Sequence, residues 1–439
     1  MLTFAGLAII FCVVATLLSG RVHAVAALAA IPLAGALVAG FSPGDIAGFF
    51  GEGMAKVSPV AAMFVFAILF FGVMDDAGIF RPIIGGLVAA TRGNVVAVAV
   101  GTGIAGMLAH LDGAGATTFL LTIPAIAPLY RRLGMDPYLM LMLLAIGAGI
   151  FNMFPWAGPL GRAAAVTGVP VTELWRPLIP VQACGAILLV GFAAAFGFRE
   201  QRRLSIGDAA PVGYSEAIPA GTDKPAADQG PSRPMNLWLN GGLLVAVIAS
   251  LVAGSLPAAY IFMLGLAVAL PLNYKGAAAQ SAAISAHAAN ALSMAAIIFA
   301  AGAFLGVLSG AGMLTSIAGD IARILPTPFL PWLHIALGIF GLPMELVLNT
   351  DAYYFGLLPV VAEVVAPYGV SAPETVYALM VGNIIGTFIS PFSPALWLAL
   401  GLSGLDMGAH IRRALLPMWA FSLALMAVAA ALGVIVPPA

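Results

Sequence analysis

The sequence contains very little charge. Of its 439 residues, 17 are Lys or Arg and 18 are Asp or Glu, so only 8% are charged. An ordinary soluble domain carries about 25% charged residues. A soluble fold of this length could not cover its surface with so few charges. This scarcity excludes a soluble enzyme, a nucleic-acid-binding protein and a disordered chain. The net charge of −1 gives no bulk charge bias that would point to a partner.

Cysteine is equally scarce. The chain has two, Cys12 and Cys184, and both lie inside apolar runs. They are far apart and have no metal-ligand spacing, so we expect them to pack among apolar side chains. The sequence also lacks a nucleophile–base pair, a P-loop or a nucleotide-binding fingerprint. No enzymatic activity and no tightly bound cofactor are therefore expected.

Apolar residues are abundant instead and make up 62% of the chain, together with 51 Gly and 31 Pro. Because helices satisfy their own backbone groups in lipid, apolar runs of helical length predict an all-α, polytopic membrane protein. The runs long enough to cross a bilayer, or nearly so, are 1–19, 24–40, 59–80, 138–155, 178–198, 237–253, 258–273, 290–309, 374–389 and 414–435.

Two further apolar regions, 94–130 and 331–366, are interrupted by small and polar residues. The interruptions are Leu111–Gly115 and Asn349–Asp351. Such breaks persist at membrane depth only where protein or a wet cavity satisfies the freed backbone groups. We predict that both regions are re-entrant hairpins.

Basic residues predict the orientation of the chain. With residue 1 outside and both hairpins returning to their own side, most Lys and Arg residues fall in the cytoplasm, as the positive-inside rule requires. Arg21, Arg199, Arg203 and Arg413 are among them. Residues 199–236 are rich in charge and proline and predict a flexible cytoplasmic linker. This linker separates an N-terminal membrane repeat, 1–198, from a C-terminal one, 237–439.

The two parts resemble each other. Phe71–Phe80 aligns with Leu305–Leu314, and Pro124, Gly134 and Pro155 align with Pro359, Gly369 and Pro391. Each part has five crossings and one hairpin, so the second is predicted to enter the membrane upside down, as in the inverted repeats of secondary transporters.

Proline predicts one more break in each repeat, because it cannot continue a helix. The breaks lie at Asn152–Pro159 and Ser390–Pro394. Half-helix N-termini offer N–H donors to an anion, and carbonyl ends suit a cation. We expect the breaks to lie beside the hairpin tips and to form a binding site there.

Arg162 is the only basic residue near a helix break, and its guanidinium matches a carboxylate. The alternative interpretation is that Arg162 pairs with Asp112 or Glu173, or simply faces the outer interface. We predict that the substrate is bound by polar or small residues at the four breaks, namely Arg162, Asn152, Gly158, Thr117, Thr118, Asn349, Thr350, Ser390 and Ser393.

Asp112 and Asp351 occupy near-symmetric positions on the two tips. Ionisable groups at membrane depth are functional candidates by default, although each acid could instead cap the helix that follows. His110 could relay a proton, because imidazole titrates near physiological pH, or could simply pack. We assign cation or proton coupling to Asp112, Asp351 and His110, and metal binding to Asp112 and Asp351.

Several motifs together resemble those of a known protein family. They are Gly72–Gly78, Leu111–Gly115, Pro155–Pro159 with Arg162 following, and Asp351–Gly356 with Leu358–Val360. Over nearly its whole length the chain resembles the citrate–metal:proton symporter family (CitMHS) of the ion-transporter superfamily. The resemblance implies proton-coupled uptake of citrate complexed with a divalent cation, across the bacterial inner membrane, by an elevator-type homodimer.

One departure from that pattern leaves alternatives open. Ala114 stands where the family pattern has a second acid, so a free di- or tricarboxylate is an alternative to a Mg²⁺ or Ca²⁺ complex. Na⁺ is the alternative to a proton as the coupling ion. A sodium/proton antiporter or an inorganic-anion transporter of the same superfamily is a second hypothesis.

Overall fold

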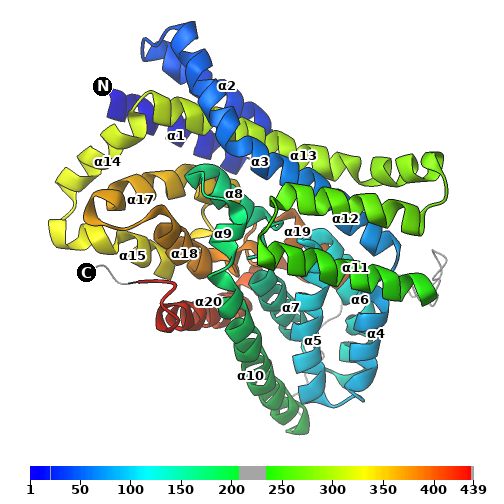
Figure 1. Ribbon diagram of the computed structural model, residues 1–439. Coiled ribbons are helices and arrows are strands. Elements are labelled where there is room, and N and C mark those ends of the chain that lie inside the picture. The colour runs from blue at the N-terminus through cyan, green and yellow to red at the C-terminus, as the bar shows by residue number, and fades with distance from the viewer. Residues whose placement is uncertain (20, 207–233, 437–439) are drawn as a thin grey trace.

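All regular elements are helical in the residues that the computed structural model describes, which are 1–19, 21–206 and 234–436 (Figure 1). The predicted all-α class is therefore confirmed. Seven described helices are long and apolar enough to cross a membrane. They are α1 (Leu2–Ser19), α3 (Pro43–Asp76), α5 (Val95–Ala109) with a short extension, α10 (Leu178–Ser205), α11 (Pro234–Ala253), α13 (Ala277–Gly310) and α20 (Met407–Ala431).

The other α-helices are shorter or less apolar. They are α2 (Ala24–Val38), α4 (Phe80–Ala90), α6 (Gly115–Leu133), α7 (Pro137–Phe151), α8 (Gly158–Thr167), α9 (Val171–Trp175), α12 (Ala258–Asn273), α14 (Met313–Ile324), α15 (Leu333–Ile339), α16 (Gly341–Met344), α17 (Leu358–Val365), α18 (Ala372–Asn383) and α19 (Pro394–Ser403). Short 3₁₀ or π turns join them at η1 (His110–Asp112), η2 (Thr327–Trp332), η3 (Ala352–Leu357), η4 (Ala366–Tyr368) and η5 (Gly386–Phe388).

The chain is interrupted at all four predicted places. One apolar region divides into α5, η1 and α6, and the other into α15, α16, η3 and α17. Helix α7 stops before α8, and α18 stops before α19, with Pro155 and Pro391 inside these two breaks. The re-entrant course of the two hairpins stays a prediction.

Several predicted bounds differ from those observed. Helix α3 begins at Pro43 and not near residue 59, because Ser42 and Asp45 form a capping box that starts it. Its first turns carry Glu52 and Lys56, so a search for apolar runs misses them. Likewise, α13 begins at Ala277 and not near residue 290.

The predicted linker is shorter than expected at its start. Helix α10 continues through residues 199–205, where Arg203 pairs with the buried Glu200. Residues 207–233, which make up most of the predicted linker, lie outside the described residues. Of the two cysteines, Cys184 is partly buried, whereas Cys12 is exposed on α1, so the expectation of packing was wrong for Cys12.

Helices α3 and α13 have 34 residues each and cross the molecule side by side (Figure 1). Gly53 of α3 lies against Gly302 and Gly306, whereas Gly72, nearer the other end of α3, lies against His287. The two helices therefore run antiparallel. This is the relation that an inverted repeat requires of its equivalent helices.

One glycine contact occurs in both parts of the chain. An added Cβ at Gly147 of α7 would collide with the carbonyl oxygen of Gly103 in α5. The same holds for Gly382 of α18 and the carbonyl oxygen of Gly338 in α15. Both members of the second pair lie 235 residues after those of the first. Each hairpin thus packs tightly on the broken helix of its own half.

Each hairpin also contacts the other half of the chain. Helix α8, from the first half, packs on η3, α17 and α18, and α19, from the second half, packs on α6. Figure 1 shows α8 beside α17 and α18 accordingly. These contacts of α8 and α19 bring the four helix breaks together in two neighbouring groups. The polar residues predicted for the site lie on the four breaks.

Candidate functional site

The first hairpin turns at Gly113, whose φ of 73° lies in the left-handed region that favours glycine. The Asp112 carboxylate accepts a hydrogen bond from the Ala114 N–H at 2.8 Å and so caps the turn. The indole N–H of Trp156, in the α7–α8 break, donates to the Leu111 carbonyl oxygen at 2.8 Å. The tip is thereby fastened to the broken helix.

His110 is fully buried at this tip and both of its ring nitrogens have partners. Its Nε2 lies 3.3 Å from Asn152 Oδ1, and its Nδ1 lies 2.8 Å from Thr118 Oγ1. An amide oxygen only accepts, so Nε2 carries a proton. The Thr118 hydroxyl can donate to Nδ1 or to the Ala114 carbonyl oxygen 2.9 Å away. The same partners therefore satisfy both the neutral imidazole and the protonated one.

Glu345 ends the first arm of the second hairpin and is fully buried. Its Oε1 accepts a hydrogen bond from Asn383 Nδ2 at 2.9 Å, and Ser390 Oγ donates to its main-chain carbonyl oxygen at 2.6 Å. Its Oε2 has no hydrogen-bond partner among the residues that the structure describes. A buried carboxylate oxygen without a hydrogen bond costs free energy, so Glu345 is a candidate functional residue.

Glu345 was not among the residues predicted from the sequence. It lies 235 residues after His110, in the same register that relates Gly147 to Gly382. Each of the two contacts an asparagine at the broken helix of its own half, Asn152 or Asn383. In the 235-residue register His110 therefore aligns with Glu345, whereas Asp112 and Asp351 are 239 residues apart. Extending the repeat register across the hairpins would have found Glu345.

Arg162 and Asp351 join the two halves of the chain. Arg162 Nε donates to Asp351 Oδ1 at 2.6 Å, and the two side chains are only 10% and 17% exposed. The partner of Arg162 is therefore Asp351 and not Asp112 or Glu173, the two partners that the alternative interpretation named. An added Cβ at Gly158 would lie 2.5 Å from Arg162 Nη1, so this glycine leaves room for the guanidinium.

An open cleft of about 400 Å³ reaches this ion pair. Asp351 and Asn349 line it together with Arg21 and His23, from the α1–α2 connection. Arg21 is one of the residues that predict the cytoplasmic face. The cleft therefore lies on the side that carries the predicted cytoplasmic charges.

The remaining predicted residues have varied surroundings. Asn349 Oδ1 accepts the N–H of Ala352 at 2.7 Å and so starts η3. Thr117 lies beside Asp112. Thr350 and Ser393 make no side-chain hydrogen bond within the described ranges. Gly158 begins α8, whose first N–H groups have no acceptor in their own helix.

The two residues predicted to bind metal are not joined in the structure. No hydrogen bond or ion pair between described residues links Asp112 to Asp351 or Arg162. Among those residues, no group of three or more His, Cys, Asp or Glu side chains is arranged to hold a metal ion.

Sequence comparison matches nearly the whole chain to known transporters. The family described as "Citrate transporter" (CitMHS) matches residues 3–382. A Bacillus subtilis (strain 168) protein named "Citrate transporter" is 35% identical over 412 residues, covering 93% of this chain and 94% of that protein. The "Mg(2+)/citrate complex secondary transporter" of the same organism is 33% identical over 417 residues, covering 94% of each.

Two solved structures share the fold. The Alcanivorax borkumensis YdaH transporter has a TM-score of 0.60 at 16% identity, covering 90% of this chain and 89% of that one. Neisseria gonorrhoeae MtrF, described as illuminating a class of antimetabolite efflux pumps, has a TM-score of 0.59 at 13% identity, covering 87% and 83%. At such identities the likeness concerns the fold alone.

Proposed function

This chain belongs to the CitMHS family of citrate transporters, which are secondary transporters and not enzymes, and from this premise we propose that it carries citrate or a related carboxylate as a complex with a divalent cation. The observation that carries the proposal is the contact between Arg162 and Asp351, at 2.6 Å and largely shielded from solvent. It offers one positive and one negative group side by side.

A metal–citrate complex matches such a pair of charges. A free carboxylate arm of the substrate would take the guanidinium of Arg162, which binds carboxylates with two parallel hydrogen bonds. The cation would take the carboxylate of Asp351. Mg²⁺ and Ca²⁺ prefer oxygen ligands, and the substrate's own oxygens provide most of the coordination shell in the complex. Binding then replaces one ion pair by two.

A free tricarboxylate fits this site less well. It would gain the contact with Arg162 but would place additional negative charge beside Asp351. Like charges at short distance in a region of low dielectric constant repel strongly. The family relative named for a Mg(2+)/citrate complex is consistent with this preference. We therefore favour the metal complex over the free acid as the substrate.

The neighbouring polar residues support the remaining assignments. Asn152, Gly158, Thr117 and Thr118 at the first pair of breaks, and Asn349, Thr350, Ser390 and Ser393 at the second, would surround the carboxylate and hydroxyl groups. Both α8 and α6 begin here, and helix N-termini favour anions. Asp112 would act as a second cation or proton site at the first tip.

We assign proton coupling to one buried group in each hairpin, His110 and Glu345. His110 has partners for both of its charge states. Glu345 has one carboxylate oxygen without a partner, which a proton would neutralise. Glu345 lies six residues before Asp351 in the same hairpin, and Arg162 is ion-paired with Asp351. A substrate that rearranges this ion pair would therefore change the proton affinity of Glu345, as coupling requires.

The wider organisation is part of the same proposal. The chain would lie in the bacterial inner membrane, with 199–236 as a cytoplasmic linker between the repeats 1–198 and 237–439. The hairpins and broken helices would move together against α3 and α13 in an elevator-type homodimer. Support comes from the antiparallel α3–α13 pair and from the exchange of α8 and α19 between the halves. The cleft beside Asp351 would be the cytoplasmic exit.

Uptake by reconstituted protein tests the proposed substrate. Proteoliposomes with an inward proton gradient are given radiolabelled citrate in the presence of Mg²⁺, of Ca²⁺ or of a chelator, with protein-free liposomes as the control. We expect uptake with at least one divalent cation and little with the chelator. Equal uptake in all three conditions would overturn the metal complex and leave the free carboxylate as the substrate.

A further inference from the structure

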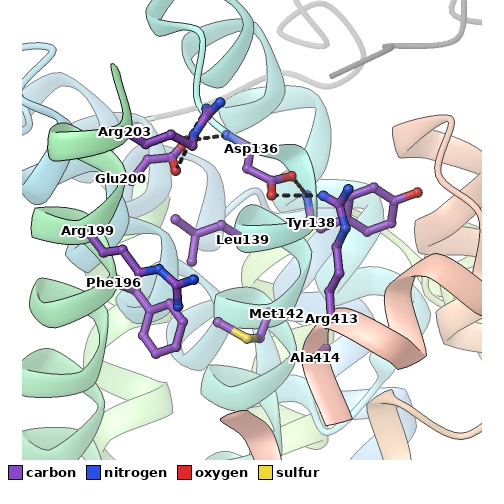
Figure 2. Close-up of a pocket in the computed structure, with 10 residues that line it drawn as sticks. All are labelled: Asp136, Tyr138, Leu139, Met142, Phe196, Arg199, Glu200, Arg203, Arg413 and Ala414. Atoms are coloured by element: carbon purple, nitrogen blue, oxygen red, sulfur yellow. Dashed lines mark hydrogen bonds and ion pairs between the residues drawn. The ribbon is translucent and has the colours of Figure 1, made fainter. Parts of the chain in front are cut away.

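A second polar cavity is lined by none of the residues of the proposed transport site. It has a volume of about 510 Å³ and is enclosed by the first turns of α7, the last turns of α10 and the start of α20 (Figure 2). Arg199, Arg203, Arg413, Asp136 and Glu200 form its charged lining. The basic residues at these helix ends are among those that predict the cytoplasmic face.

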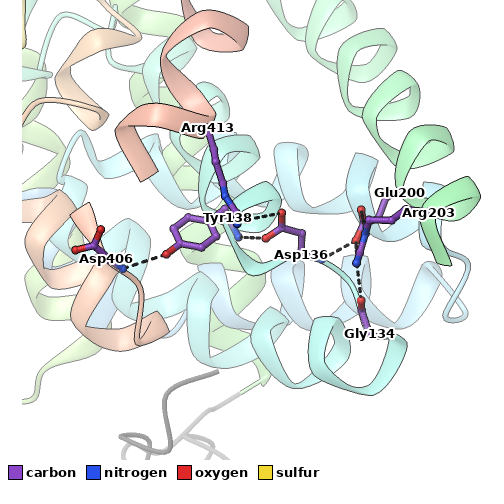
Figure 3. A network of polar contacts seen from close by, with 7 residues as sticks. All are labelled: Gly134, Asp136, Tyr138, Glu200, Arg203, Asp406 and Arg413. Carbon is purple, nitrogen blue, oxygen red and sulfur yellow. Dashed lines mark hydrogen bonds and ion pairs between the residues drawn. The ribbon is translucent and has the colours of Figure 1, made fainter. Parts of the chain in front are cut away.

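Four of the five charged groups are paired with one another (Figure 3). Arg203 donates to both carboxylate oxygens of Glu200, at 2.9 and 2.7 Å, and Arg413 donates to Asp136 at 3.0 Å. The main-chain N–H of Asp136 donates to Glu200 at 2.6 Å, which links the two pairs. The guanidinium of Arg413 also lies 4.5 Å from the centre of the Tyr138 ring. The two ion pairs and the main-chain hydrogen bond thus join the three helices around the cavity.

Arg199 is the fifth charged residue of the cavity lining. Its guanidinium points into the cavity (Figure 2) and makes no ion pair or hydrogen bond with any residue that the structure describes. Three guanidinium groups face two carboxylates, so the cavity has one uncompensated positive charge. Arg199 is exposed at the cavity mouth, so its guanidinium is accessible to an anion, and a phosphate would restore neutrality.

The lining changes from polar to apolar with depth. On α10, Phe196 lies one turn before Arg199 and Glu200, farther from the helix end. On α7, Leu139 and Met142 follow Asp136 and Tyr138 and so lie farther from the start of the helix. All three apolar side chains line the cavity. Charge at the rim and hydrocarbon beneath it is the order found in a phospholipid at the membrane interface.

We propose that this cavity binds the phosphate headgroup of an anionic phospholipid of the inner leaflet, of the phosphatidylglycerol or cardiolipin class. Arg199 holds the phosphate, while the Arg203–Glu200 and Arg413–Asp136 pairs fix the walls. Phe196, Leu139 and Met142 contact the first acyl carbons. Basic pockets between membrane helices on the cytoplasmic side are suited to such headgroups. The apolar floor favours a lipid over inorganic phosphate, which has no hydrocarbon to place there.

Lipid binding to purified, detergent-exchanged protein tests the proposal. Native mass spectrometry measures retained lipid, and a thermal-unfolding titration measures stabilisation, for phosphatidylglycerol, for zwitterionic phosphatidylcholine and for inorganic phosphate. The variant is Arg199→Ala, whose side chain pairs with no described residue and so should fold. Arg202→Ala is the matched control, because it removes the same charge from the same helix end without lining the cavity.

We expect phosphatidylglycerol to bind and stabilise the wild type and Arg202→Ala, with Arg199→Ala weakened about fivefold, since one basic residue near an anionic headgroup contributes about 1 kcal/mol. Equal binding by the two variants would overturn the site. Stabilisation by inorganic phosphate that matches the lipid and depends on Arg199 would overturn its assignment to a lipid. Neither measurement involves transport, so both are independent of the proposed function.

Discussion

Arg162 in α8 and Asp351 at the start of η3 are separated by 189 residues in the chain and by 2.6 Å in the structure. The two residues come from different halves and lie at different helix breaks. Their contact exists because α8 crosses to the second hairpin. It places opposite charges together at a point where the chain otherwise offers mostly apolar side chains.

Removing the arginine tests its role in binding. Arg162→Ala is expected to weaken the binding free energy of citrate by about 2–5 kcal/mol, which is more than tenfold in affinity. The substitution leaves Asp351 unpaired and the substrate's carboxylate without its partner. Arg162→Lys keeps the charge but loses the two-pronged geometry and should be intermediate. Calorimetric titration with citrate and Mg²⁺ measures both. Unchanged affinity in Arg162→Ala would exclude this residue from the site.

Neutralising Glu345 separates proton coupling from substrate movement. Glu345→Gln keeps the shape of the side chain and its contact with Asn383 but cannot exchange a proton. We expect proton-driven accumulation to be lost, while exchange of internal for external citrate continues, and His110→Gln should behave likewise. Glu363→Gln, on α17 and bonded to Thr315, is the control. Normal accumulation in both Glu345→Gln and His110→Gln would contradict the assignment.

The hairpin tip offers a subtler change. Trp156→Phe removes the N–H that donates to Leu111 but keeps a ring for the stacked contact with Phe154, whose centroid is 4.7 Å away. The lost hydrogen bond should weaken substrate binding by about 0.5–1.5 kcal/mol by loosening the tip. Trp419→Phe removes a comparable bond, to the main-chain carbonyl oxygen of Ile339, outside the first hairpin. An identical affinity for the two variants would show that the tip contact has no part in binding.

Glycine packing at the broken helix gives a stability test. Gly382→Ala is expected to destabilise the protein by about 1–3 kcal/mol, because the new methyl group meets the backbone of α15. Gly242→Ala in α11, where a Cβ meets open space, should instead stabilise the helix by up to about 1 kcal/mol. Thermal unfolding in detergent measures both. Equal shifts in midpoint would contradict the close contact between α15 and α18.

Much of this arrangement could be predicted from the sequence. Apolar runs and prolines located most of the long helices and all four breaks, and the isolated Arg162 indicated the candidate site. These features depend on local composition, and the cost of charge or an unpaired backbone in lipid makes them conspicuous. The starts of α3 and α13 were missed because both helices begin with turns that carry polar side chains, which a search for apolar runs does not include.

The pairing of residues was harder to predict. Nothing local indicates that Arg162 would meet Asp351, because their contact depends on how α8 crosses to the other half. Glu345 was missed because it lies inside an apolar run, where a single acid resembles an interfacial charge. Only the 235-residue register, which aligns Glu345 with His110, distinguishes Glu345 from an interfacial charge.

The central claim is that citrate and a divalent cation enter together at the Arg162–Asp351 pair. The most direct measurement is uptake of radioactive citrate and radioactive Ca²⁺ or Mn²⁺ in the same proteoliposomes, by the wild type and by Asp351→Asn. The account predicts that each tracer requires the other in the wild type, and that Asp351→Asn loses cation uptake. Citrate uptake that proceeds at the same rate without the cation, in both proteins, would contradict it.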